Sequence, residues 1–313
     1  MNKDILVTIV IPVYNRAHTL DRLFASIEKV TWHALEIILV DNNSKDTSLE
    51  ICRRFKERNQ DKFLVEIYTE SEQGACPCRN LGLQKAHGQY VYFFDSDDEM
   101  SPHYLSDAMQ AVKSDTDIVC SPTQMFFSNG KIQTRRFYFT SRASVQILTA
   151  SLSTQSILFK KSFIEKIGGW DVRLWRWNDW ELGIRTLLNA PNIVWLKQPY
   201  HKIHQHPDSI TGNSFSKDYT HLKRSIMAVR RLLENIPTDR KEHTASLNAL
   251  SAKTYILSAQ LAREEAYTEA KELRQIASRF STGNYLLKIL APIICKYIEW
   301  GGIGGWKIFM LLT

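Results

Sequence analysis

The chain has 313 residues, of which 44% are hydrophobic and 23% are charged, as in an ordinary globular protein. Its formal net charge of +7 favours anionic partners: a nucleotide, a phospholipid surface or nucleic acid. Five cysteines without zinc spacing argue against a disulfide framework and favour a reducing cytosol. No stretch approaches the roughly 20 apolar residues of a spanning helix, and the N-terminus lacks a signal peptide's long apolar region.

The first 120 residues alternate between strand and helix patterns. The predicted strands are 6–11, 36–40, 65–68, 90–94 and 117–120. The predicted helices are 19–30, one that starts at Asp46 or Thr47 and runs towards Gln60, 75–86 and 102–113. This order predicts an α/β fold with a mostly parallel sheet and helices on both faces.

Three polar clusters follow predicted strands, at the edge where ligands bind in such sheets. They are the segments 12–15, 41–44 and 95–98. The first loop contains neither GxGxxG nor GxxxxGK[ST], which argues against a dinucleotide enzyme and a P-loop NTPase. The sequence therefore predicts a ligand site of another kind at this edge.

The most informative cluster is Asp95-Ser96-Asp97-Asp98, which follows the apolar run 90–94. Neighbouring carboxylates repel one another, and Mg²⁺ or Mn²⁺ would relieve that repulsion while binding phosphate oxygens. The cluster thus indicates a metal that carries a phosphorylated substrate. The alternative interpretation is an acidic turn, because Asp and Ser are common turn residues.

The middle of the chain is less regular. Residues 121–165 predict a smaller lobe over the sheet edge. Four tryptophans between residues 170 and 180 indicate either an aromatic-walled pocket or the start of a core-facing helix. His201, His204 and His206 indicate either a metal or phosphate site or a solvated loop.

From about residue 217 the sequence predicts helices, over 217–235 and 243–280. Residues 213–313 carry 15 Lys and Arg against 9 Asp and Glu, so most of the net charge lies there. The end, 285–313, is predicted to form amphipathic helices at an anionic membrane, with Trp300 and Trp306 at headgroup level. The alternative is a pair of short helices that pack on the rest of the protein.

Taken together, these clusters resemble the motifs of the family 2 glycosyltransferases of the GT-A fold. The resemblance covers about residues 5 to 211 and rests on five segments in order: 7–15, 40–47, 74–82, 94–98 and 168–171 followed by Asn178-Asp179. It implies a GT-A domain over 1–212, with a nucleotide-binding half (1–120) and an acceptor half (121–212). Residues 213–313 would form a helical C-terminal extension.

The resemblance implies a metal-dependent hexosyl or related sugar transferase that uses a UDP- or GDP-sugar and Mn²⁺ or Mg²⁺. The residues implied in nucleotide-sugar binding are Pro12, Tyr14, Asn15, Asp41, Asn43, Arg79, Asp95 and Ser96. Those implied at the metal and diphosphate are Asp97, the favoured ligand, Asp95 and His206, with His204 as a second choice for the last.

Asp179 would be the general base that deprotonates the acceptor hydroxyl, with inversion at the anomeric carbon, and Glu181 is the second choice. Two positions depart from the family pattern. Asn178 replaces the usual Glu before the base, and Asn42 stands where Asp is common. The expected acceptor is a glycan or, if 285–313 contacts a membrane, a lipid-linked sugar in cell-envelope synthesis. The expected location is the cytoplasm, with peripheral attachment to the cytoplasmic face of the inner membrane as the finer prediction.

Two other classes are alternatives. Asn178 motivates a binding module that holds a nucleotide-sugar or glycan without turnover. A nucleotidyltransferase would share the strand order, but residues 12–16 lack its Gly-rich triphosphate loop. Nucleic acid is not expected as a partner, because no basic-aromatic reader motif is present.

Overall fold

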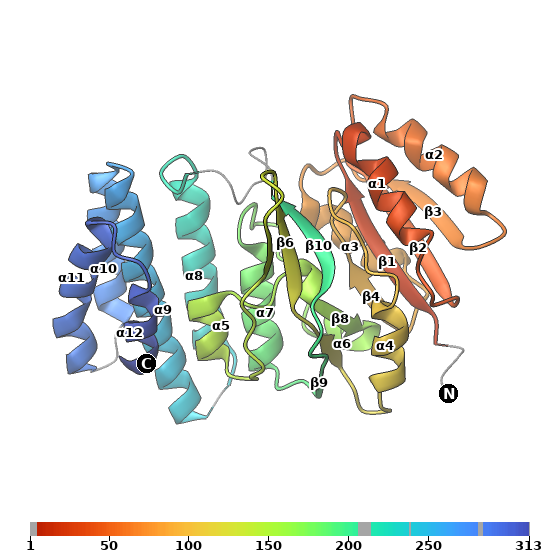
Figure 1. Cartoon of the computed structure of the whole chain (residues 1–313). Coiled ribbons are helices and arrows are strands. Elements are labelled where there is room, and N and C mark those ends of the chain that lie inside the picture. The colour runs from red at the N-terminus through yellow and green to blue at the C-terminus, as the bar shows by residue number, and fades with distance from the viewer. Residues whose placement is uncertain (1–4, 206–213, 238, 281–283, 313) are drawn as a thin grey trace. The chain divides into compact units, whose positions relative to one another are not determined.

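A computed structural model describes residues 5–205, 214–237, 239–280 and 284–312. The chain divides into two compact units. The first, here called the sheet unit, contains Met1–Phe139, Ser151–Trp175 and Pro191–His206. The second, the helical unit, contains Thr140–Ala150, Arg176–Ala190 and Pro207–Thr313. Figure 1 shows the elements of both units.

The sheet unit is built on a seven-stranded sheet with the order β3-β2-β1-β4-β8-β5-β9. All its pairings are parallel except those of β8, which is antiparallel to both neighbours. The strands are β1 (Val7–Val13), β2 (Leu35–Asp41), β3 (Leu64–Thr69), β4 (Tyr90–Phe93), β5 (Ile118–Cys120), β8 (Ile157–Lys160) and β9 (Ile193–Trp195). The expected mostly parallel α/β fold is confirmed.

A smaller sheet, with the order β10-β6-β7, completes the unit's strands. It consists of β6 (Thr123–Phe127), β7 (Ile132–Thr134) and β10 (Tyr200–Gln205). β10 is parallel to β6, and β7 is antiparallel to it. A bridge between Glu99 and Lys202 ties this sheet to the turn that follows β4.

Helices cover both faces of the large sheet. The helices and the 3-10 turn of this unit are α1 (Ala17–Ile27), α2 (Ser48–Asn59), α3 (Ala75–Lys85), α4 (Tyr104–Ala111), η1 (Thr154–Ser156) and α6 (Lys161–Lys166). Buried side chains of α1, α2 and α4 form one core with alternate residues of β1 and β2. This arrangement arises because β1 and β2 are apolar on both faces and must be covered on both.

Helix α3 covers the opposite face and lies unusually close to β1. A Cβ atom on Gly82 would lie 2.2 Å from a methyl group of Val10, well inside van der Waals contact. The glycine therefore lets the helix backbone approach the strand and fixes the position of Arg79, one turn earlier in α3.

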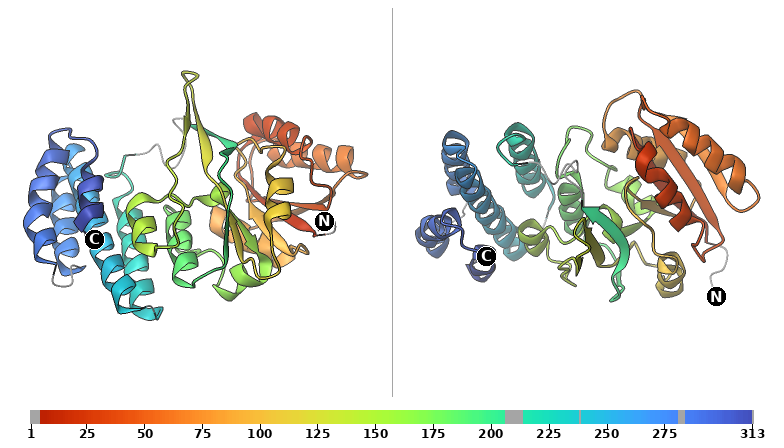
Figure 2. Two further views of the ribbon diagram at one scale, coloured as in Figure 1. Left: turned by 60° about the horizontal axis from the view of Figure 1, so that its bottom comes forward. Right: turned by 45° about the horizontal axis from the view of Figure 1, so that its top comes forward.

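The helical unit consists of α5 (Ala143–Thr149), α7 (Asn178–Leu188), α8 (Tyr219–Asn235), α9 (Arg240–Arg263), α10 (Tyr267–Phe280), α11 (Tyr285–Glu299) and α12 (Gly305–Leu312). The long helix α9 packs against α5, α8, α10, α11 and α12. In the views of Figure 2, α9, α10 and α11 run side by side.

Most sequence-predicted elements are present, with three differences. β1 continues through Pro12 to Val13, whereas the strand was predicted to end before the proline. The helix predicted over 243–280 is two helices, α9 and α10, and Glu265 between them has a left-handed φ of 63°. Segments 140–150 and 176–190 group with the helical unit, although the predicted domain boundary was at 212.

Candidate functional site

The loop after β1 carries three of the predicted nucleotide-binding residues. Pro12 lies in β1, Tyr14 is 45% exposed, and Asn15 has a left-handed φ of 51°. Asn15 accepts a hydrogen bond at Oδ1 from the backbone N–H of Lys45 (2.8 Å), and its own N–H donates to Ser44 Oγ (3.1 Å). These bonds hold the loop against the segment that follows β2.

Asp41, the last residue of β2, is 3% exposed. Its Oδ2 accepts a hydrogen bond from the Ser44 N–H at 3.1 Å, but its buried Oδ1 has no partner within the described part of the chain. A buried acceptor without a partner costs about 1–3 kcal/mol, so this atom points to an N–H or O–H of a ligand. Asn43 follows in a left-handed conformation, and its Nδ2 lies 3.5 Å from the Ser71 carbonyl.

Asn42, where the family pattern commonly has Asp, is a buried structural residue. Its Nδ2 donates to the carbonyls of Glu70 and Glu72, each at 2.8 Å. Its Oδ1 accepts from Gln73 Nε2 (2.8 Å) and from the backbone N–H of Gly74 (2.7 Å). A carboxylate could not donate the first two bonds, so the asparagine suits this loop.

Asp95, the first residue of the acidic cluster, is held from two sides. Arg79 Nη2 donates to Asp95 Oδ1 at 2.6 Å. Arg79 is only 5% exposed, and its guanidinium lies 4.3 Å from the centre of the Trp170 ring. Gln155 Nε2 donates to Asp95 Oδ2 at 2.8 Å and also to Asp98 Oδ2 at 2.6 Å. Arg79 and Gln155 therefore fix the position of Asp95, whose side chain is still 32% exposed.

Gln155 was not predicted from the sequence. It lies in η1, directly before the antiparallel strand β8, and that strand brings it to the edge where β4 ends. The surrounding residues Ser153 to Ser156 give no local signal of a site, because serine, threonine and glutamine are ordinary in loops.

Asp97 faces two arginines of the first helical region. The Arg16 guanidinium lies 3.4 Å from Asp97 Oδ2, and Arg22 donates to the Asp97 carbonyl. The preceding Ser96 accepts at its carbonyl from Thr19 Oγ1 at 2.9 Å. Neither arginine was predicted, although both lie within a few residues of the recognised first-strand motif.

Asp98 is buried and supports the turn. Its Oδ1 accepts the backbone N–H of His204 at 2.8 Å. Burial, together with the negative charges of Asp97 and Asp95, raises the pKa of Asp98 well above its ordinary range. Asp98 is therefore a buried support of the turn, held by the His204 N–H and by Gln155.

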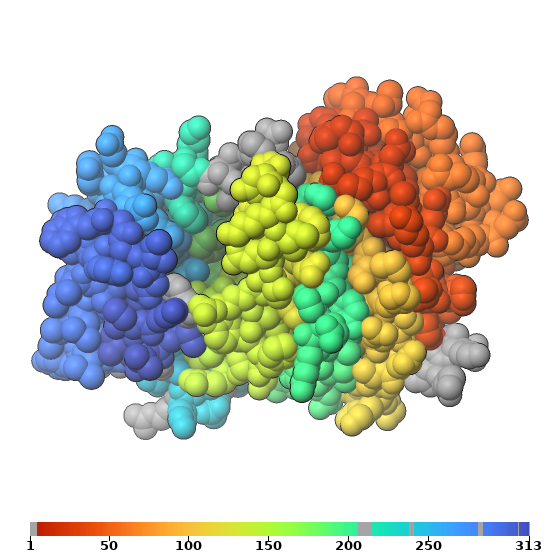
Figure 3. Space-filling view, in the orientation of Figure 1, coloured from red at the N-terminus to blue at the C-terminus, as the bar shows by residue number. Residues whose placement is uncertain are grey.

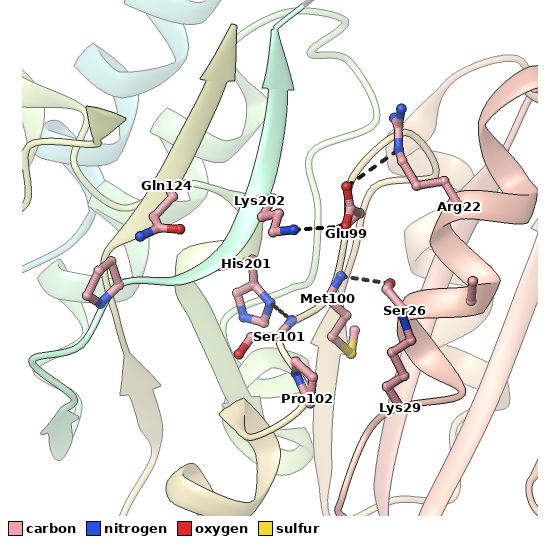
Figure 4. Close-up of a pocket in the computed structure, with 12 residues that line it drawn as sticks. Arg22, Ser26, Lys29, Glu99, Met100, Ser101, Pro102, Gln124, His201 and Lys202 are labelled. Atoms are coloured by element: carbon pink, nitrogen blue, oxygen red, sulfur yellow. Dashed lines mark hydrogen bonds and ion pairs between the residues drawn. The ribbon is translucent and has the colours of Figure 1, made fainter. Parts of the chain in front are cut away.

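A pocket of about 400 Å³ lies behind the acidic turn (Figure 4). Glu99 closes one side through ion pairs with Lys202 (3.3 Å) and Arg22 (4.0 Å). His201 Nδ1 accepts the N–H of Ser101 at 3.1 Å, and burial lowers the pKa of His201 to about 3, which keeps the ring neutral. These contacts anchor the segment that follows the carboxylates.

The predicted histidine cluster does not converge in the described residues. His201 Nε2 lies 2.8 Å from Tyr92 OH, and His204 Nε2 lies 2.8 Å from Glu99 Oε1. His206 lies outside the described residues. Among those that are described, no group of three or more His, Cys, Asp or Glu side chains is arranged to hold a metal ion.

The proposed base lies in the helical unit. Asp179 is in the first turn of α7, after Trp177 with its left-handed φ of 58°, and Asp179 is half-buried. Glu181 is 2% exposed, and its oxygens accept from Arg185 at 2.8 and 2.9 Å. Arg185 thus occupies both oxygens of Glu181, whereas Asp179 Oδ1 accepts the backbone N–H of Trp180 at 2.8 Å.

The tryptophan-rich segment contributes mainly to packing. Trp170 is buried in the sheet unit edge-on to Phe93 (5.2 Å between ring centres), and Trp180 is buried in the helical unit, where its Nε1 donates to the Ile147 carbonyl. Trp175 is 46% exposed, and its ring lies beside Gly74. Of these three, only Trp175 is exposed.

Known proteins resemble this chain in sequence and in fold. The family model described as "Glycosyl transferase family 2" matches residues 8–168, about half of the chain. The crystal structure of TarS from S. aureus in complex with UDP-GlcNAc is similar, with a TM-score of 0.69 and 18% identity over 98% of this chain and 90% of that one. The mannosyltransferase PcManGT from Pyrobaculum calidifontis, in complex with GDP-Man and Mn²⁺, gives 0.60 and 15% over 98% and 83%.

Three curated relatives match shorter segments. Glycosyltransferase GlyG of Streptococcus pneumoniae is 36% identical over 36% of this chain and 38% of its own. The cholesterol galactosyltransferase of Borreliella burgdorferi is 33% identical over 39% and 33%. The GalNAc(5)-diNAcBac-PP-undecaprenol beta-1,3-glucosyltransferase of Campylobacter jejuni is 31% identical over 33% and 33%. Each match thus spans little more than a third of the relative.

The structural likenesses establish the GT-A fold. The family match runs from β1 to α6 and includes Asp41, Asp97 and the described residues that contact them. The chain therefore belongs to glycosyl transferase family 2.

Proposed function

We propose that the protein is a metal-dependent, inverting glycosyltransferase that moves a sugar from a nucleotide diphosphate-sugar to an acceptor hydroxyl. The observation that carries this proposal is the buried Oδ1 of Asp41, which lacks a partner in the described residues. This atom lies at the carboxyl edge of the sheet, as do the carboxylates that follow β4.

Asp41 would accept an N–H of the nucleotide base at its Oδ1, while Tyr14 and Asn15 border the same edge. TarS and PcManGT bind UDP-GlcNAc and GDP-Man, which supports a UDP- or GDP-sugar donor here. Arg79 is bound to Asp95 and stacked on Trp170, so it would act by positioning Asp95. Asp95 in turn would contact the ribose or the metal.

The carboxylates fit a divalent cation. Mg²⁺ and Mn²⁺ are commonly held by one or two carboxylates together with substrate phosphates and water. Asp97 and Asp95 stand two residues apart on one turn, and both side chains are partly exposed. When bound, the ion would stabilise negative charge on the leaving diphosphate. Asp97 would be its main protein ligand, and Arg16 would lie beside the phosphates.

Asp179 would accept the proton of the acceptor hydroxyl. The acceptor oxygen would then bond to the anomeric carbon from the face opposite the diphosphate, and the bond from that carbon to the diphosphate oxygen would break. One displacement of this kind inverts the configuration. Asp179 lies in the first turn of α7, where its Oδ1 accepts the N–H of Trp180 at 2.8 Å.

The acceptor is proposed to be a glycan or a lipid-linked sugar. The names of two relatives, the cholesterol galactosyltransferase and the undecaprenol-linked glucosyltransferase, support lipid acceptors. A role in cell-envelope polysaccharide or glycolipid synthesis, and a location at the cytoplasmic face of the inner membrane, belong to the same proposal.

The test is diphosphate release from a panel of UDP- and GDP-sugars, with Mn²⁺, with Mg²⁺ and with a chelator. Asp179→Asn should abolish transfer and leave UDP or GDP binding intact. Asp115→Asn, in an exposed loop, is the matched control and should behave as wild type. Donor binding without any turnover in the wild type would instead identify a binding module, the alternative that Asn178 motivates. Full transfer by the Asp179 variant would refute the assignment of the base.

A further inference from the structure

One side of helix α11 packs on the helical unit and the other is exposed. The buried side consists of Leu287, Ala291, Ile294, Cys295 and Ile298. The exposed side, here called the α11 face, consists of Tyr285, Leu286, Ile289, Ile293, Tyr297 and Trp300. Their exposed fractions run from 48% for Tyr297 to 83% for Trp300. In Figure 3, residues 285–312 (blue) lie at the surface of this unit.

The α11 face continues beyond the end of the helix. Gly301 and Gly304 have left-handed φ values of 92° and 87°, which allow the chain to turn sharply into α12. Ile303 in this turn is 90% exposed, and Leu311 in α12 is 88% exposed. So many adjacent exposed aliphatic and aromatic side chains are uncommon on a monomer and indicate an interaction surface.

The charges of this region are mostly positive. Lys288, Lys296 and Lys307 are exposed, and Glu299 is the one acidic residue of 284–312. Glu299 is paired with Lys296 at 3.0 Å and with Arg274. An apolar helix face accompanied by lysines, with aromatic rings such as Tyr285 and Trp300 at its two ends, is typical of helices that lie in a membrane interface.

The segment is too short to cross a bilayer. Fifteen residues of α-helix extend about 22 Å, less than the hydrocarbon thickness of about 30 Å. Among the helices of the described chain, none is both long and apolar enough for a membrane span. The α11 face would therefore lie along a surface.

We propose that the α11 face, with Ile303 and Leu311, docks onto an anionic lipid surface. The occupant is inferred from charge, because the exposed lysines complement acidic headgroups while the apolar side chains enter the acyl boundary. A second copy of this chain would bring the same lysines together across a two-fold interface, which charge complementarity disfavours. The side chain of Trp306, expected at headgroup level, lies outside the described residues.

The test is co-sedimentation of the full chain with vesicles of phosphatidylcholine, with and without phosphatidylglycerol. Wild type should bind the anionic vesicles, and the double variant Ile289→Glu/Ile293→Glu should bind at least tenfold more weakly. Tyr267→Glu is the matched control, because Tyr267 is also an exposed aromatic residue (67%) of the helical unit but lies at the start of α10. It should bind as wild type does.

A second variant tests the electrostatic part. Lys288→Gln/Lys307→Gln should weaken binding to anionic vesicles by about fivefold for each lysine removed. Lys296 is left in place because it is paired with Glu299. Circular dichroism and the thermal midpoint of each variant, measured without lipid, show that the fold is retained.

The proposal would be overturned if the double glutamate variant bound vesicles as well as wild type does. It would also be overturned if wild type bound neutral and anionic vesicles equally. A third contrary outcome is a wild-type protein that binds no vesicles but forms a dimer, which the two glutamates dissociate. The last outcome would assign the face to contact between copies. Because the readout uses no donor, its failure is distinct from failure of the proposed sugar transfer.

Discussion

Replacing Gln155 by leucine should test how the acidic turn is held. The side chain's Nε2 donates to Asp95 Oδ2 at 2.8 Å and to Asp98 Oδ2 at 2.6 Å. Hydrogen bonds to charged groups contribute about 1.5–3 kcal/mol each. Without the amide between them, the carboxylates of Asp95 and Asp98 also repel each other more strongly. Gln155→Leu should therefore lower the free energy of unfolding by about 3 kcal/mol.

The assay is urea denaturation followed by tryptophan fluorescence, with titration of UDP and GDP in parallel. Gln124→Leu, on β6 of the same unit, is the control and should change stability by less than about 1 kcal/mol. Donor affinity should fall in the Gln155 variant, because Asp95 then keeps only Arg79 of its two described side-chain partners. A loss of stability below about 0.5 kcal/mol would refute the bridging role.

Three further changes test other parts of the sheet unit. Asp41→Asn should weaken UDP or GDP binding about tenfold or more by calorimetry, since a charge-assisted bond is lost; unchanged affinity would contradict the base contact. Gly82→Ala should destabilise the fold by about 1–3 kcal/mol, because the new Cβ meets Val10, and adding Val10→Ala should restore part of that loss in thermal melts. His201 has a folded pKa of about 3, below its unfolded value, so wild-type stability should fall as the pH drops from about 6.5. His201→Gln should remove that slope, about 1.4 kcal/mol per pH unit, and equal slopes in urea denaturation at pH 5 to 7 would contradict it.

The strands and the residues at their ends could be predicted from the sequence, because a parallel sheet buried on both faces requires long apolar runs. Asp41 and Asp95 are visible as the polar residues that end two such runs. The prediction succeeds here because a strand buried on both faces must be largely apolar, so the polar residue after the apolar run marks the strand's end. Amphipathic helices over 285–313 were predicted from lysines and tryptophans among the apolar residues, and the structure determines which side of α11 is exposed.

The remainder could not be predicted because it depends on contacts between distant segments. Gln155 reaches Asp95 because β8 runs antiparallel between β4 and β5. The sequence of residues 121–165 has no periodicity from which that strand order could be predicted. Asn42 departs from the family pattern, and only the structure shows that the loop before α3 engages both ends of its amide. The break between α9 and α10 at Glu265 was not predicted, because the residues on both sides of it have strong helix propensity.

The insertion of β8 also has a consequence for the order in which the protein folds during synthesis. A nascent chain that ends at residue 120 contains β1 to β5, but β4 then presents an unpaired edge and Asp98 lacks both Gln155 and His204. The carboxylate turn can reach its final form only after residue 204 has left the ribosome. Until β8 has emerged, the open edge of β4 is available for mispairing and for the action of chaperones.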